Sequence, residues 1–157
     1  MKTDRAIEEI MMGMVREKAA GIYSETLIEH GVNPRNYGSM ENPDGYAKVT
    51  GPCGDTVEMF VRMRNGAVER ATFTTDGCMF SIAACSAAAE MAEGKTLAGC
   101  IGINQSAILD HLEKMPADHE HCALLATMTI RKALRECADR NKQDDRTGEI
   151  PHATAGG

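Results

Sequence analysis

The chain has 157 residues, 43% of them hydrophobic, with 17 basic and 23 acidic residues and a net charge of −6. This length fits one domain with a sizeable core, so the six cysteines are not needed as structural disulfides. An acidic chain with 4% aromatic residues and no tryptophan argues against nucleic acid as a partner. The sequence shows neither a secretory signal nor a run of transmembrane length, so we expect a cytoplasmic protein without a membrane partner.

The first 22 residues are predicted to form an amphipathic helix. Apolar side chains recur there at the three- and four-residue spacing of one helix face: Ile7, Ile10, Met11, Met14 and Val15. This N-terminal extension either docks on its own domain or serves as a partner or dimerisation element. A second, short helix is expected after Ser24, a favourable N-cap, and ends near Gly31.

Three strands are predicted next, at 46–50, 56–64 and 68–75. Residues 56–64 alternate between apolar and polar side chains, and Asn65-Gly66 is a strong hairpin signal. Helical patterns then follow at 79–92, from about 96, at about 105–113 and at about 121–140, and the polar tail at 141–157 is expected to be disordered. The predicted class is α+β: a small three-stranded antiparallel sheet with helices packed on one face.

Three cysteines with distinctive neighbours fall at predicted element boundaries. Cys53 lies in Gly-Pro-Cys-Gly-Asp between the first two strands, Cys78 follows the third strand, and Cys122 begins the last helix. Thiolates are ligands for zinc or an iron–sulfur cluster, and each such site usually has four ligands. The fourth ligand is left open between Asp55, two residues beyond Cys53, and a histidine.

The two candidate histidines are His121, directly before Cys122, and His119. Helix N-termini stabilise anions, so lowered thiol pKa values are expected for Cys78 and Cys122. The other three cysteines lie in apolar surroundings and are interpreted as small buried hydrophobes: Cys85, Cys100 and Cys137.

The motifs around these residues resemble those of the U-type iron–sulfur cluster assembly scaffolds, the IscU/NifU N-terminal family. The likeness covers about residues 23–140, in matching order and spacing. It includes Tyr23-Ser24-Glu25, Asn33-Pro34-Arg35-Asn36, Cys53-Gly54-Asp55, Asp76-Gly77-Cys78, Gly94-Lys95-Thr96-Leu97 and His121-Cys122. The resemblance implies a SufE/NifU-like fold for a scaffold domain at 23–140, between the helical extension at 1–22 and the tail at 141–157.

The resemblance further implies a scaffold or carrier protein rather than an enzyme. Such scaffolds receive persulfide sulfur from a pyridoxal-phosphate cysteine desulfurase, take up iron, assemble a labile [2Fe–2S] cluster and pass it to apoproteins. An iron donor and an electron donor are therefore also expected as partners. By position, Cys53, Cys78 and Cys122 are the cluster ligands, Asp55 is the carboxylate that makes the cluster labile, and His121 is an alternative ligand. Cys122 is expected to accept the persulfide first, and Zn²⁺ is expected in the same site when the cluster is absent.

The chain departs from the family in two places that bear on partners. A Leu-Pro-Pro-Val-Lys tract recruits a dedicated Hsp70 chaperone in the bacterial IscU branch, whereas this chain has Met-Pro-Ala-Asp-His at 115–119, so the resemblance does not extend to that chaperone. Between Cys78 and Cys122 there is no room for the large insertion of the zinc-dependent SufU sulfurtransferases. A zinc-dependent sulfurtransferase stays as the alternative function and a structural zinc module as a third. The protein is expected to be a monomer or a homodimer.

Overall fold

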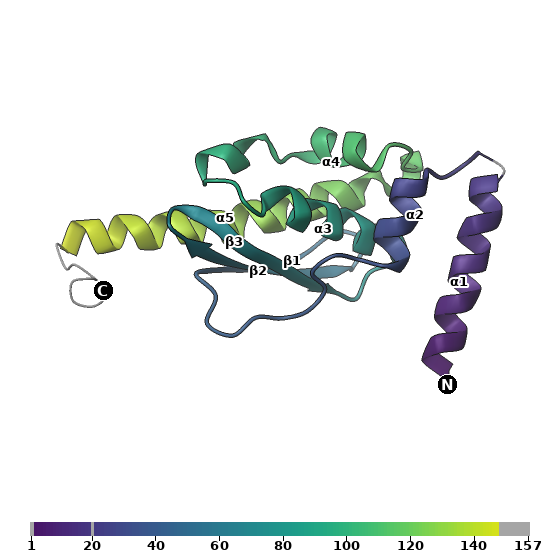
Figure 1. Ribbon diagram of the computed structural model, residues 1–157, viewed down its shortest axis with the longest axis horizontal. Coiled ribbons are helices and arrows are strands. Elements are labelled where there is room, and N and C mark those ends of the chain that lie inside the picture. Colours follow the sequence, from purple (N-terminus) through teal and green to yellow (C-terminus); the bar gives the residue numbers. More distant parts are fainter. Residues whose placement is uncertain (1, 20, 148–157) are drawn as a thin grey trace.

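The sheet is the centre of the fold in the computed structural model, which describes residues 2–19 and 21–147 (Figure 1). Strands β1 (Gly45–Thr50), β2 (Thr56–Arg64) and β3 (Ala67–Thr75) are antiparallel neighbours in that order. The central strand pairs Met59 with Ala47 on one side and with Phe73 on the other. The sequence therefore predicted all three strands and the antiparallel order correctly.

The hairpin between β2 and β3 turns at the predicted Asn-Gly pair. Both Asn65 and Gly66 have positive φ, 54° and 81°, the conformation that a tight two-residue hairpin turn requires. The loop before β1 runs alongside the outer edge of β3. The Phe73 N–H donates to the Asn36 carbonyl, and the Gly38 N–H donates to the Phe73 carbonyl. This loop extends the sheet edge beyond the three strands.

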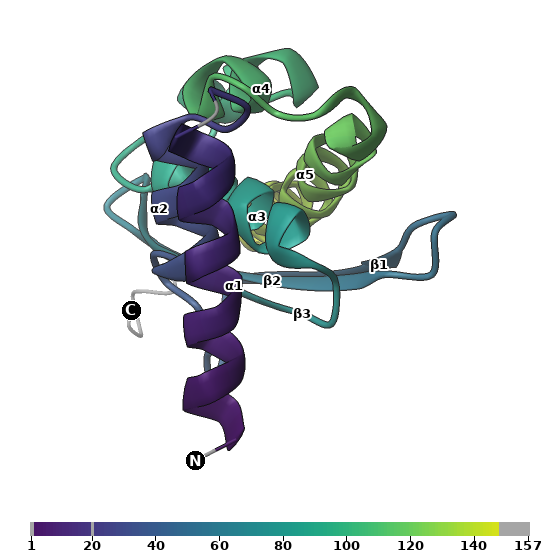
Figure 2. The same cartoon turned by 90° about the vertical axis from the view of Figure 1, so that its right-hand side faces the viewer.

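Helices cover one face of the sheet. In Figures 1 and 2, α3 (Met79–Ala92) and α5 (Glu120–Thr147) lie directly on the sheet, and α2 (Glu25–Val32) and α4 (Gln105–Leu112) lie around them. Alanines of α3 that are fully buried allow the helix to approach the sheet closely: Ala83, Ala84, Ala87 and Ala88. A helix that is apolar on all sides is typically buried, and α3 lies between the sheet and the outer helices.

Two short 3₁₀ helices complete the helical layer, at Ala98–Gly102 and Ala117–His119. The second leads directly into α5, so the predicted start of the last helix is correct to within one residue. Among residues 2–19 and 21–147, no helix is both long and apolar enough to cross a membrane.

The ends of the chain differ from the expected boundaries. Helix α1 (Lys2–Ala19) stands beside α2 (Figure 2) and keeps much of its apolar face exposed, although Met14 is buried. At the other end, α5 continues past 140 to Thr147, because a polar composition does not break a helix and residues 141–147 contain neither glycine nor proline. The remainder of the predicted tail, 148–157, lies outside the described residues.

Candidate metal centre

The three marked cysteines all lie at one end of the sheet, opposite the β2–β3 hairpin. Cys53 is exposed in the β1–β2 turn, where Gly54 adopts a φ of 93°. Cys78 is the N-cap residue of α3, and Cys122 lies in the first turn of α5 with 2% of its surface exposed. Three segments far apart in the sequence thus carry their thiols to the same end of the molecule.

The tightest group at this end contains two thiols and an imidazole. The ligand atoms of Cys78, His119 and Cys122 all lie within 4.8 Å of one another. His119 comes from the 3₁₀ helix before α5, and its ring stacks on Phe80 with ring centroids 4.1 Å apart. Its Nδ1 is buried and has no hydrogen-bond partner, so the ring is held in place by packing.

A buried serine that the sequence interpretation missed connects the carboxylate to the thiols. The Ser81 Oγ lies 3.3 Å from the Asp55 Oδ2 and 3.3 Å from the Cys122 Sγ, and the residue is 1% exposed. Asp55 therefore lies one hydroxyl group away from the thiol pair. Ser81 is three residues beyond Cys78 on α3, and this spacing on one helix face was the signal that could have identified it.

Gly77 makes room for this arrangement. A Cβ atom at this position would lie 2.6 Å from the Ser81 Oγ and 2.9 Å from the Asp55 Oδ2. No real Cβ tolerates contacts this short with fixed neighbours. The absence of a side chain at Gly77 is thus a steric condition for the approach of Asp55 to the thiols.

Two further predicted ligands, Cys53 and His121, are not part of this group. Cys53 is not in the group whose ligand atoms all lie within 4.8 Å of one another. His121 is exposed, and its Nε2 lies 3.8 Å from the Cys122 Sγ. Of the two histidines that the sequence left open, His119 is the one that the structure groups with both thiols.

A hydrogen bond between the thiols of Cys78 and Cys122 shifts their pKa values in opposite directions. This bond lowers the pKa of Cys78 to about 5, with help from the backbone N–H groups of Phe80 and Ser81 and from the charge of His119. The same bond, together with burial, raises the pKa of Cys122. The expectation of a lowered pKa is therefore confirmed for Cys78 and wrong for Cys122, because Cys122 is the buried donor of the pair.

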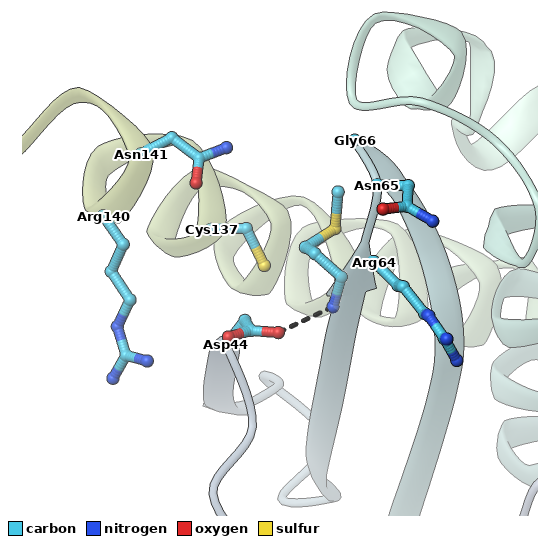
Figure 3. A pocket seen from close by; sticks show the side chains of 8 residues that line it. Asp44, Arg64, Asn65, Gly66, Cys137, Arg140 and Asn141 are labelled. Atoms are coloured by element: carbon cyan, nitrogen blue, oxygen red, sulfur yellow. Dashed lines mark hydrogen bonds between the residues drawn. The ribbon is translucent and has the colours of Figure 1, made fainter. Parts of the chain in front are cut away.

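The remaining cysteines are buried and have raised pKa values because of burial, as expected for small hydrophobes. Figure 3 shows Cys137 beside Asp44 at the opposite end of the sheet, in a cavity of about 560 Å³ that also contains Arg64 and Arg140. Burial raises the pKa of Cys137 to about 12. No second thiol lines this cavity, so it lacks the ligands of a soft-metal site.

The fold and the site define an α+β domain with a half-exposed group of thiol, imidazole and carboxylate ligands at one end of its sheet. The chain belongs to the family described as the NifU-like N terminal domain, which matches residues 22–144. It is 34% identical over 130 residues to "Iron-sulfur cluster assembly scaffold protein IscU 1" of Archaeoglobus fulgidus, covering 82% of this chain and 85% of that protein. It is 38% identical over 119 residues to "Iron-sulfur cluster assembly scaffold protein IscU" of Haemophilus influenzae, covering 73% and 94%.

The fold is also similar to that of a solved NifU-like structure. The crystal structure of a nitrogen-fixing NifU-like protein (N-terminal) from Brucella abortus superposes with a TM-score of 0.65 at 20% identity, covering 76% of this chain and 96% of that one. The family model and the relatives confirm the family inferred from the sequence motifs, and the structural likeness confirms the fold class.

Proposed function

We propose that this protein is a scaffold on which a labile [2Fe–2S] cluster is built and from which the cluster is passed to apoproteins. The observation that carries the proposal is the convergence of Cys78, Cys122 and His119 within 4.8 Å, with Asp55 one hydroxyl group away. Membership of the NifU-like family and the names of the relatives support it. The cluster is cargo, so the protein acts as a carrier and not as a turnover enzyme.

The ligand set fits a cluster that is held and then released. Cys78, Cys122 and the exposed Cys53 supply the thiolates that iron–sulfur clusters require. Asp55 supplies a hard oxygen ligand that matches a soft site poorly and exchanges readily. His119 is a second candidate for the fourth position because its ring is already beside the thiols, and His121 is a third.

Sulfur delivery is assigned to Cys78 in preference to Cys122. Cys78 is exposed and its pKa is lowered, whereas Cys122 is buried and its pKa is raised, so Cys78 is the better nucleophile of the pair. The Cys78 thiolate attacks the outer sulfur of a persulfide on a pyridoxal-phosphate cysteine desulfurase. The S–S bond of that persulfide breaks, a new S–S bond forms on Cys78, and the desulfurase cysteine leaves as a thiolate.

Cluster closure needs further partners, because the delivered sulfur has the oxidation state of elemental sulfur. Two electrons from an electron-donor protein reduce each such sulfur to sulfide and regenerate the Cys78 thiolate. An iron donor supplies the two iron ions. Apo-acceptor proteins then remove the cluster by exchanging their own thiolates for the scaffold ligands.

The test is anaerobic reconstitution with iron and sulfide, followed by transfer to an apo-ferredoxin. We expect a visible charge-transfer band with matched iron and sulfide, and slower transfer from Asp55→Ala than from wild type. Asp110→Ala, on an exposed turn of α4, is the control. Unchanged or faster transfer from Asp55→Ala would contradict the role of the carboxylate. Tight zinc without a cluster would favour the zinc-dependent sulfurtransferase, and unfolding on chelation without persulfide formation would favour a structural zinc module.

A further inference from the structure

A second group of metal-ligand side chains lies on the helical layer, away from the cysteines. His30 in the last turn of α2, Glu90 on α3 and His111 in the last turn of α4 place one ligand atom each within 4.8 Å of the others. Glu90 is twelve positions beyond Cys78 on or next to α3, and at about 1.5 Å per residue this separates the two groups by roughly 18 Å. The cysteine site cannot share a metal ion with this group.

The geometry of the group matches a tetrahedral metal site more closely than a hydrogen-bonded one. The Nε2 atoms of His30 and His111 lie 3.3 and 3.4 Å from the same oxygen, Oε1 of Glu90. Bonds of about 2.0–2.1 Å to nitrogen and oxygen place two ligands of a tetrahedral Zn²⁺ ion about 3.3 Å apart. Ordinary N–H···O hydrogen bonds measure about 2.7–3.2 Å, and bonds to a carboxylate lie at the short end of this range.

The surroundings orient two of the three ligands, His30 and Glu90. Ser86 Oγ lies 2.7 Å from the Nδ1 of His30, and the same oxygen accepts the Arg35 N–H, so the buried ring is held by its second nitrogen. This outer contact is typical of metal-binding histidines. Arg35 Nε lies 3.8 Å from the other oxygen of Glu90, which leaves Oε1 as a single donor atom.

The helix ends and the exposure also suit a cation. His30 and His111 are both in the last turns of their helices, where the partial negative charge of the helix end favours a positive charge. The His30 side chain is 3% exposed, whereas those of Glu90 and His111 are 42% and 38% exposed. The group is therefore fixed on its inner side and open to water on its outer side, where a fourth ligand has access.

We propose that His30, Glu90 and His111 form a second divalent-metal site that binds Zn²⁺ or Fe²⁺ independently of the cysteine centre. Two imidazoles and one carboxylate with an open position are a ligand set for both ions. The site ties together α2, α3 and α4, which are the three helices that contribute its ligands. It contains no thiolate, and this distinguishes it chemically from the cluster site.

The test is titration with Co²⁺ under anaerobic conditions. The wild-type chain is expected to bind a Co²⁺ ion that shows visible d–d bands without a thiolate-to-cobalt band. His111→Gln and Glu90→Gln should each lower the affinity for this Co²⁺ ion by more than the roughly 10–100-fold that loss of an outer-shell partner costs. Asp110→Asn removes a neighbouring charge on α4 without removing a ligand, and should bind as wild type does.

Separate titrations with Zn²⁺ and with Fe²⁺ then identify the ion that the site prefers. Cys78→Ser should reduce any thiolate-to-cobalt band and leave the thiolate-free ion unchanged, so failure of the cluster site and failure of this site give different results. The proposal is overturned if wild type binds no thiolate-free Co²⁺, or if His111→Gln binds it as tightly as wild type. Both variants alter half-exposed side chains, and circular dichroism of each variant confirms that the fold is intact.

Discussion

The close contact at Gly77 predicts that Gly77→Ala disturbs the metal centre directly. The added Cβ would meet the Ser81 Cβ at 2.7 Å and the Ser81 Oγ at 2.6 Å, whereas carbon atoms in contact normally lie about 3.5–4.0 Å apart. Ser81 is 1% exposed, so its side chain cannot move out into solvent. Overpacking of this kind costs about 1–3 kcal/mol in the free energy of unfolding.

The assay is urea denaturation of the metal-free protein, combined with a zinc titration. Thermal denaturation of the same variants is a second readout, in which each kcal/mol of destabilisation lowers Tm by about 2–4 °C for a chain of this size. Zinc affinity should fall as well, because Asp55 is displaced together with Ser81. Gly102→Ala is the matched control, since a Cβ there meets nothing within 4 Å, and its expected change is neutral or stabilising by up to about 1 kcal/mol. Equal stability and equal zinc affinity of Gly77→Ala and wild type would refute the steric argument.

Two further predictions concern the thiol pair and the capping of α2. Once a chelator has removed bound metal, iodoacetamide should modify Cys78 with a pH midpoint near 5 and leave Cys122 unmodified. Cys122→Ala should move the midpoint for Cys78 upward, because it removes the main cause of the lowered pKa of Cys78. An unchanged midpoint would refute the shared hydrogen bond. Ser24→Ala should cost about 2 kcal/mol in urea denaturation, because the hydroxyl caps α2 and also donates to the buried carbonyl of Leu112. Asn104→Ala, which removes only a cap, should cost about 1 kcal/mol, and equal losses would argue against the Leu112 contact.

The sequence predicted the sheet well because its signals are local. The alternation at 56–64 and the Asn65-Gly66 pair each specify a strand or a turn without reference to the rest of the chain. The same holds for the placing of Cys78 and Cys122 at helix starts. The end of α5 was predicted less well, because a polar segment is equally compatible with a solvent-exposed helix and with disorder.

The inner arrangement of the site was less predictable because it depends on tertiary contacts. Whether a helix-start thiol is ionised depends on its exposure and on its neighbour, and this reversed the expectation for Cys122. Ser81 and Gly77 matter only because Asp55 reaches them from another loop. His30 and His111 lie on two different helices, and only the packing of α2 against α4 brings their ring centroids to 5.4 Å from each other.

The three cysteines are attached to parts of the fold that differ in how much must move for each to withdraw. Cys122 is anchored in α5, the longest of the described helices, which packs along the sheet, and Cys78 caps α3, most of whose residues are buried. Cys53 is at the exposed tip of a tight turn. Two backbone hydrogen bonds close this turn, from the Gly51 N–H to the Asp55 carbonyl and from the Gly54 N–H to the Gly51 carbonyl. Displacing that tip disturbs little of the core, so we expect a bound cluster to detach first from the Cys53–Asp55 side, while the two helix-borne thiols form the stationary half of the site.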